Sequence, residues 1–569
     1  MMRAVRIRGA SAWARSVAIV FAALVTIGAN ALVSAAAPTL TNVFPPGGQR
    51  GTTVTVTCKG KFDWPVSIAA AGVKVTAKEE SGKLDVEIPA DLAADRVWIR
   101  LYNAEGASSA VPFLVGSLKE LNEEEPNNSP TKPQKLEGAA TINGVLTKGD
   151  VDGFAVTLEA GQTLVAAMDA NTKLGSPIDA ILQVATDKGF VVAENNDEVG
   201  LDPRLIYRAE KPGVYIVRAF AFPSTPDSTI AYSGGETSLY RLTITSGPFI
   251  AFAAPFSAPL AEPGAVGVLG WNLPEGMKLP VLPYGGADPQ GQVEVEPQAE
   301  DRLAAESRLG IVFSPEAGSA RVRLTPFPVL SNTEPSADQS LALPVPGAVM
   351  GRLREPRETD RYRLTLKKGD SLLVVPEGKS DFPADPVLQL ADPAGKVVVS
   401  LEELSGGRRR GGAGAQVLSH SAAQDGDYEL RVRDRFRRGS EWAYYQLTAR
   451  IEVPDFELTT GADAVVAAPD KPGEVTVNVE RRGSGIGTIT IEAVDLPEGV
   501  TAAAVVSEPK GDSAKKVKLS ITTSGGAFSG VIRVKGTAKE PSEINRFART
   551  PVQLGGCFDR MWLTVIAKP

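Results

Sequence analysis

The densest group of chemically capable side chains is the stretch EEEPNNSP, residues 123–130, which holds three carboxylates and two side-chain amides. Carboxylate and amide oxygens are the ligands that hard cations such as Ca²⁺ prefer. The same composition is also typical of a solvated hinge, because proline stiffens the chain and asparagine forms Asx turns. These residues alone therefore leave two alternatives open, a metal site and an acidic linker.

Other chemically capable residues give weaker signals. His420 is the only histidine, so a Ser-His-Asp or Cys-His site would have to use it, and no G-x-S-x-G or H-E-x-x-H motif occurs. The acidic loop 193–202 lacks the EF-hand pattern and is interpreted as solvated. The arginines of 405–416 and of RDRFRRGS, residues 433–440, are expected on solvated loops. The alternative is a basic patch for an anionic surface polymer.

Composition favours many short strands. The 569 residues include 56 glycines and 42 prolines, and this density of chain breakers suits frequent turns and disfavours long helices. A chain of this length is expected to form about three to five domains. The net charge of −7 is spread along the sequence, so it carries no basic footprint for nucleic acid.

The N-terminus predicts export. Arginines precede an apolar run that ends in small residues, and residues 1–37 are therefore interpreted as a cleaved signal peptide, with a membrane anchor as the alternative. No later stretch is apolar enough to span a bilayer, so the expected location is periplasm, cell surface or medium. Of the two cysteines, Cys58 is expected as a small buried hydrophobe, and a bridge to Cys557 requires the two chain ends to meet. A structural zinc site is not expected.

An internal repeat organises the sequence. DGFAVTLEAGQTLVA from Asp152 matches DRYRLTLKKGDSLLV from Asp360, and three further matches follow in the same order at an offset of about 210 residues. One of them aligns Tyr240 with Tyr445. His420 aligns with Tyr207, which indicates a packing position rather than a catalytic one.

The repeat extends upstream, so each unit has a smaller leading module and a larger trailing module. Alternating apolar and polar residues, separated by Gly or Pro turns, predict antiparallel strands throughout. The predicted fold class is all-β, a tandem array of antiparallel β-sandwiches of Ig-like and jelly-roll-like type. The predicted ranges after the signal are 38–117 (first leading module), 118–247 (first trailing module), 248–329 (second leading module), 330–452 (second trailing module) and 453–569 (C-terminal module).

The first trailing module resembles the bacterial pre-peptidase C-terminal domain. The resemblance rests on an ordered series from Glu123 to Ile244: E-x-E-P-N-N, D-x-D-x-F, L-x-x-G-x-x-L, S-P-x-D-x-x-L-x-V, N-N-D, P-G-x-Y-x-V-R and Y-x-L-T-I. The second trailing module resembles the same family in degraded form. The leading modules resemble IPT/TIG domains, and the C-terminal module resembles Ig-like domains of large exported bacterial proteins of planctomycete type.

The resemblance implies a jelly-roll-like sandwich that is typically non-catalytic and aids secretion, substrate contact or adhesion. Family members hold calcium at the acidic segment that opens the domain. Carried onto this sequence, the implied ligands of one Ca²⁺ are Glu123, Glu125, Asn127, Asn128, Asp150 and Asp152. Asn128 stands where family members often carry Asp, which weakens the implied site by one charge.

The second trailing module serves as an internal comparison. Most of the implied oxygen ligands are replaced there, among them by Asn332, Ser336 and Ala337, while the surrounding strand patterns persist. We therefore expect no metal in the second copy, and we expect the fold to form without one.

The sequence favours an exported, non-enzymatic binding, adhesion or accessory protein. The expected partners are extracellular or envelope proteins or polysaccharides, without nucleic acid. Two alternatives are a secreted, peptidase-associated hydrolase with accessory domains and a structural spacer in the envelope. The hydrolase would need a catalytic domain, for which the five predicted modules leave no large unassigned block.

Overall fold

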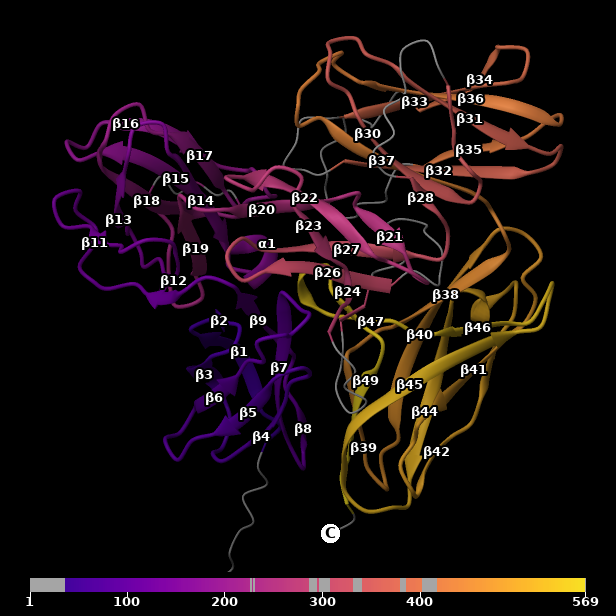
Figure 1. The fold of residues 1–569 in the computed structure, drawn as a ribbon. Coiled ribbons are helices and arrows are strands. Elements are labelled where there is room, and N and C mark those ends of the chain that lie inside the picture. Colours follow the sequence, from indigo (N-terminus) through magenta and orange to yellow (C-terminus); the bar gives the residue numbers. More distant parts are fainter. Residues whose placement is uncertain are drawn as a thin grey trace, which may run out of the picture. The chain divides into compact units, whose positions relative to one another are not determined.

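The computed structural model in Figure 1 consists almost entirely of β-strands, which confirms the predicted all-β class. Residues 1–35 of the predicted signal segment, 1–37, lie outside the described residues. Within the described part, no helix is long and apolar enough to cross a membrane. The structure describes residues 36–225, 228, 231–285, 294–295, 308–330, 340–378, 385–401 and 417–567.

The first trailing module is a sandwich of two five-stranded sheets, ordered β10-β12-β19-β14-β17 and β11-β13-β18-β15-β16. Most neighbours are antiparallel, while β10 and β11 join their sheets in parallel with β12 and β13. Its elements are β10 (Glu120–Asn122), β11 (Gln134–Lys135), β12 (Ala140–Val145), β13 (Asp152–Leu158), β14 (Thr163–Asp169), α1 (Asn171–Leu174), β15 (Ile178–Thr186), β16 (Val191–Asn195), β17 (Arg204–Arg208), β18 (Gly213–Pro223) and β19 (Leu239–Thr245).

The second trailing module repeats this topology strand for strand, with sheets β28-β30-β37-β32-β35 and β29-β31-β36-β33-β34. Its two short edge strands, β28 and β29, are again parallel to their neighbours. The repeat seen in the sequence is thus a repeat of topology. Its strands are β28 (Val329–Leu330), β29 (Leu341–Ala342), β30 (Gly347–Arg352), β31 (Asp360–Leu366), β32 (Ser371–Gly378), β33 (Pro386–Ala391), β34 (Val397–Leu401), β35 (Leu418–Ser421), β36 (Gly426–Asp434) and β37 (Tyr444–Ile451).

The first leading module pairs the sheets β1-β3-β6-β5 and β2-β9-β7-β4, with β8 beside β7. Alternation explains β3, because Val56 and Cys58 point into the core while the intervening threonine is partly exposed. Its strands are β1 (Thr39–Phe44), β2 (Gly47–Gln49), β3 (Thr53–Lys61), β4 (Ser67–Ala69), β5 (Lys74–Ala77), β6 (Lys83–Glu87), β7 (Arg96–Asn103), β8 (Gly106–Ala107) and β9 (Val111–Gly116).

The second leading module has sheets β20-β22-β23 and β21-β27-β26-β24. The short strand β25 pairs instead with β48 of the C-terminal module. The strands of this range are β20 (Phe249–Ala254), β21 (Ser257–Pro259), β22 (Ala265–Trp271), β23 (Lys278–Pro280), β24 (Leu282–Pro283), β25 (Glu294–Val295), β26 (Arg308–Ser314) and β27 (Gly318–Thr325).

The C-terminal module is built from sheets β38-β40-β44-β42 and β39-β49-β45-β41-β43, and β46 pairs with β45. A short sheet, β25-β48-β47, adds the remaining strands. Its elements are β38 (Asp455–Thr460), β39 (Ala464–Ala467), β40 (Gly473–Arg482), β41 (Ile489–Val494), β42 (Val500–Ala502), β43 (Val505–Ser507), η1 (Asp512–Ala514), β44 (Lys516–Thr523), β45 (Phe528–Ala538), β46 (Ile544–Phe547), β47 (Thr550–Pro551), η2 (Gln553–Gly555), β48 (Cys557–Phe558) and β49 (Met561–Val565).

Five buried clusters largely follow the five predicted ranges, and two smaller clusters cross them, one joining Phe252 and Phe256 to Met350 and the other joining Trp98 and Ala110 to Phe558. Tyr284, Leu309 and Ile311 of the second leading module belong to the core cluster of the first leading module. The module boundaries themselves stay predictions. Cys58 lies in the core, where burial raises the pKa of its thiol to about 12, and it is not part of a disulfide.

The leading modules share a defect in strand pairing. In β1 and β3 the register shifts between Leu40 and Asn42, and in β20 and β22 it shifts between Ile250 and Phe252. At the second shift, a Cβ on Gly270 would lie 1.9 Å from the carbonyl oxygen of Phe249. Glycine is thus required because the two backbones approach so closely.

We predict that Gly270→Ala destabilises the second leading module by about 2 kcal/mol or more, because the added methyl group forces the two strands apart. Differential scanning calorimetry of the full chain would measure the shift of that transition. Gly526→Ala is the matched control, since a Cβ at Gly526 meets nothing within 4 Å. Equal melting curves for the two variants would contradict the prediction.

Candidate metal centre

The acidic segment folds back onto the loop that precedes β13. The segment runs between β10 and β11, and β11 lies parallel to β13 with Gln134 opposite Phe154. The Gln134 amide fixes the return of the chain, because its Nε2 donates to the carbonyl of Asn122 (3.1 Å) and its Oε1 accepts from the backbone N–H of Glu124 (2.9 Å). Residues about 25 positions apart in sequence thereby become neighbours.

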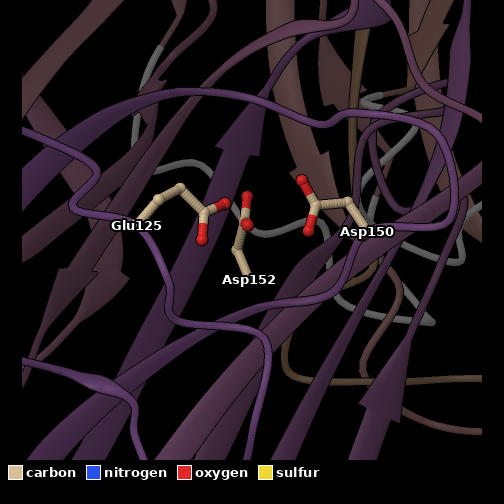
Figure 2. Close-up of side chains that lie close together, drawn as sticks. All are labelled: Glu125, Asp150 and Asp152. Atoms are coloured by element: carbon tan, nitrogen blue, oxygen red, sulfur yellow. The ribbon is translucent and has the colours of Figure 1, made fainter.

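Three carboxylates converge at this contact. Glu125, Asp150 and Asp152 each offer an oxygen, and these oxygens lie within 4.8 Å of one another. Figure 2 shows the three side chains facing one another, with Asp152 between the other two. Asp150 and Asp152 are buried, whereas Glu125 is exposed and lines an open cleft of about 550 Å³. The group is therefore deep on one side and open to water on the other.

Local hydrogen bonds hold two of these carboxylates in place. The Oδ2 atom of Asp150 accepts from the backbone N–H (3.0 Å) and the hydroxyl (2.9 Å) of Thr147, which closes the loop before β13. The Oε2 atom of Glu125 accepts from the backbone N–H of Asn127 (2.9 Å). The other oxygen of Asp150, Oδ1, also accepts hydrogen bonds, from the side-chain amide of Asn128 and from the backbone N–H of Val151.

A buried tyrosine joins the third carboxylate to a fourth. The hydroxyl of Tyr240 lies 2.6 Å from Oδ2 of Asp152 and 2.9 Å from Oε2 of Glu123. A Cβ on Gly144 would lie 2.3 Å from that hydroxyl oxygen, so the glycine makes room for the contact. A phenol carries one hydrogen, and it cannot satisfy two ionised carboxylates at once.

The pKa values of Asp152 and Glu123 reflect this shortage of hydrogen-bond donors. Burial, reinforced by the negative charge of Glu123, raises the pKa of Asp152 to about 8. Burial also raises the pKa of Glu123, and it raises the pKa of Tyr240 well above its ordinary value. Oδ1 of Asp152 has no hydrogen-bond partner although the residue is fully buried. The pair must gain either a proton or a cation to be stable in this environment.

The structure brings together half of the implied ligands directly. Glu125, Asp150 and Asp152 form the cluster, and Glu123 lies behind it, linked to Asp152 through Tyr240. The side-chain amide of Asn128 donates to Asp150. Asn127 is 1% exposed, and neither its amide nitrogen nor its amide oxygen has a partner among the described residues.

Sequence reasoning missed Tyr240 and Gly144. Both were detectable in principle, because each recurs in the second copy, as Tyr445 and Gly351. The sequence does not predict that the hydroxyl of each tyrosine contacts a buried aspartate.

In the second trailing module, the buried aspartate meets a second tyrosine in place of a second carboxylate. The hydroxyl of Tyr445 donates to the buried Asp360, and the hydroxyl of Tyr362 lies 2.7 Å from that of Tyr445. Tyr362 stands where the first copy has Phe154. Two phenols supply two hydrogens, so both contacts are satisfied with one carboxylate. The expectation that this copy binds no metal stays a prediction, and residues 332–337 lie outside the described part of the chain.

Two other candidates from the sequence have packing partners. The ring of His420 lies 5.8 Å from that of Tyr428, and Tyr207 makes the equivalent contact with Tyr215 at 5.3 Å.

In the acidic loop 193–202, Asp197 is exposed as expected. Asp202 is not: its carboxylate is buried and accepts from the backbone N–H groups of three consecutive residues at the start of α1. The interpretation as a solvated loop is therefore wrong for Asp202. The glycine-arginine loop 405–416 lies outside the described residues.

We predict that Tyr362→Phe lowers the stability of the second trailing module by about 1 kcal/mol, because a buried hydrogen bond to Tyr445 is lost. The shift of that module's calorimetric transition in the full chain would measure it. Tyr102→Phe is the control, since the contact given for its side chain among the described residues is that of its ring with Trp562, which phenylalanine keeps. A Tyr362→Phe variant as stable as this control would contradict the prediction.

We also predict a pH dependence for the metal-free chain. The pKa of Asp152 in the folded state, about 8, lies above the value of about 3.9 expected in the unfolded state. Folding therefore favours the protonated form, and the first trailing module loses stability as the pH rises from about 4 through 8. Melting curves of protein stripped of metal ions would show this slope, and Asp152→Asn would flatten it. An unchanged slope in the variant, compared with the exposed control Asp197→Asn, would contradict the assignment.

Comparisons with known proteins assign no family. A scan against protein-family models finds no match, and no curated protein matches the sequence. Among solved structures, the chain is similar to the pre-peptidase C-terminal domain of collagenase from Bacillus anthracis (16% identity, 21% of this chain and 100% of that chain, TM-score 0.16). It is also similar to SGBP-B of the mixed-linkage glucan utilization locus of Bacteroides ovatus (12% identity, 37% and 76%, TM-score 0.13). A third similar structure is the N-terminal four Ig domains of Dscam1 isoform 8.4 (11% identity, 93% and 98%, TM-score 0.18).

Proposed function

We propose that the chain is an exported, non-catalytic, multi-domain binding protein whose first trailing module is a pre-peptidase C-terminal domain stabilised by one Ca²⁺. One observation carries the metal part of this proposal. Two buried carboxylates, Asp152 and Glu123, share a single phenolic hydrogen, while Glu125 and Asp150 direct further oxygens at Asp152. A cation at this point neutralises charge that the protein itself leaves unbalanced.

No side-chain cation of the described residues takes that role. Neither a lysine nor an arginine forms an ion pair with Glu123, Glu125, Asp150 or Asp152 in the described part of the chain. Desolvated carboxylates without a partner are costly, so the cluster gains from an added ion. The alternative from the sequence, a solvated acidic linker over residues 123–130, does not account for the burial of Asn127 or for the hydrogen bond from Tyr240 to Glu123.

The donor set favours a hard cation such as Ca²⁺ over metals that prefer nitrogen or sulfur ligands. All available ligands are oxygens, and the site contains no histidine or cysteine. Ca²⁺ accepts about six to eight oxygens in flexible geometry, including carbonyls and water. The exposed side at Glu125 admits water, and the unpartnered amide oxygen of Asn127 is a further candidate ligand.

We propose a non-catalytic role because the only histidine packs against a tyrosine and because the sequence contains no nucleophile motif. The single histidine is used in a ring contact with Tyr428, and no nucleophile motif accompanies it. Binding through exposed loops of rigid sandwiches is the usual function of such arrays. The expected partners are proteins or polysaccharides outside the cell or in its envelope.

Calorimetry of the full chain tests the metal site. We predict that millimolar Ca²⁺ raises the melting temperature of the first trailing module relative to EGTA, because a ligand that binds only the folded state stabilises it by RT ln(1 + [L]/Kd). Asp152→Asn and Glu125→Gln should reduce this shift strongly. The transition of the second trailing module should not move.

Asp197→Asn is the matched control for charge, since Asp197 is exposed and belongs to the same module. This variant should keep the full response to Ca²⁺. No shift with Ca²⁺ in the unmodified chain, or an equal loss of response in the control, would overturn the assignment.

A further inference from the structure

The end of the second trailing module that corresponds to the metal centre is rich in arginine. Two loops meet there, 353–359 between β30 and β31 and 435–443 between β36 and β37. The first of them occupies the sequence position of the metal-site loop in the other copy. It keeps the same turn, because the Glu358 carboxylate accepts from the backbone N–H of Glu355 (2.8 Å) as that of Asp150 does from Thr147.

Within this turn, an arginine has replaced a glycine. Gly149 has a φ of 83°, and its counterpart Arg357 has a φ of 71°. Arg437 in the other loop has a φ of 56°. The left-handed region is uncommon for residues other than glycine, asparagine and aspartate, and each such residue costs about 1 kcal/mol or more. Two arginines held in this conformation side by side suggest a role that outweighs the strain.

The two loops form one surface. The backbone N–H of Arg357 donates to the carbonyl of Arg437 (3.2 Å), and that of Ser440 donates to the carbonyl of Leu353 (2.9 Å). A Cβ on Gly439 would lie 2.3 Å from the carbonyl carbon of Glu355, so the backbones are in close contact. The arginines of both loops are thereby held at fixed spacing.

A buried aspartate fixes the tip of the second loop. Oδ1 of Asp434 accepts from the backbone N–H groups of Phe436 and Arg438, both at 2.9 Å. Phe436 is nevertheless 61% exposed, and the guanidinium groups of Arg435 and Arg438 lie over its ring at 5.8 Å and 4.7 Å. An exposed aromatic ring between cations is thus presented on a rigid loop.

The charges of this surface are only partly balanced. Arg357, Arg437 and Arg438 are exposed, and none has a carboxylate within ion-pair distance among the residues that the structure describes. Of the nearby carboxylates, Glu441 pairs with Arg352 at 2.8 Å, Asp385 lies 3.9 Å from Arg435, Glu358 closes the turn, and Glu355 is exposed in the first loop.

We propose that this arginine surface, defined by Arg357, Phe436, Arg437 and Arg438, binds the carboxylate or sulfate groups of an acidic polysaccharide. Guanidinium groups match these planar or tetrahedral anions with paired N–H donors. The exposed ring of Phe436 offers an apolar face on which a sugar ring packs.

This inference names a ligand class for the proposed binding function, but it uses a different module from the calcium site. Loss of Ca²⁺ should leave it intact. The two proposals can therefore fail separately.

The test measures binding of the full chain to polygalacturonate and dextran sulfate, with neutral dextran as a third probe. The double variant Arg357→Gly, Arg437→Asn removes two charges and suits both left-handed positions, so the fold should be kept or slightly stabilised. We expect at least one acidic polymer to bind, binding to weaken about tenfold or more in the variant, and salt to weaken it further. The double variant Lys74→Gln, Lys518→Gln removes the same charge elsewhere and should bind as the unmodified chain does.

Binding that persists in the presence of EGTA supports the inference even if the calcium proposal fails. Equal weakening in both double variants would overturn it, because only net charge would then matter. No binding of either acidic polymer, or binding of neutral dextran as strongly as of the acidic polymers, would also overturn it. Tighter binding of a DNA duplex or of phosphatidylglycerol vesicles would assign the surface to another class of ligand.

Discussion

Both trailing modules depend on a buried aspartate at the first residue of a central strand. Asp152 opens β13 and Asp360 opens β31, and each is at most 1% exposed. A carboxylate in that position must be hydrogen-bonded, protonated or neutralised, since desolvation of an unpaired charge is expensive. In each copy a tyrosine from the opposite sheet donates the first hydrogen bond to this carboxylate. It is Tyr240 of β19 in the first copy and Tyr445 of β37 in the second. The two sheets of the sandwich are thus joined by a polar contact within the core. The copies differ in the second partner of the tyrosine hydroxyl, which is Glu123 in the first and Tyr362 in the second.

The two copies share their buried features and differ mainly in their surface loops. The strand order, the position of the register shift and the tyrosine contact recur, because each is enclosed by packed side chains that cannot change alone. The loops before β13 and β31 lie at the surface, where substitutions cost little. The exchange of Tyr207 for His420 shows the intermediate case, since an aromatic ring contact survives although the residue type changes.

Much of the architecture could be predicted from the sequence, because strand alternation and the repeat are local or periodic signals. Val56 and Cys58 point inward as their spacing predicts, and the matching motifs correspond to matching strands. The candidate site was less accessible. Asp152 and Tyr240 are 88 residues apart, so no local pattern shows that they meet. The burial of Asp202 was missed for the same reason, because its acceptor role is toward a turn about 30 residues upstream. Such contacts follow from strand order, which the periodicity of single strands does not specify.

The two copies also place positive charge differently at one end of the same sandwich. In the first, four acidic side chains gather, and no lysine or arginine of the described residues pairs with them, so a proton or an ion in solution would neutralise them. In the second, the paired phenols of Tyr362 and Tyr445 satisfy the buried carboxylate internally. In the loop above it, Arg357 stands where the first copy has Gly149. The two copies thus keep one strand order and differ in the groups that meet the buried aspartate and in the charge of the neighbouring loop.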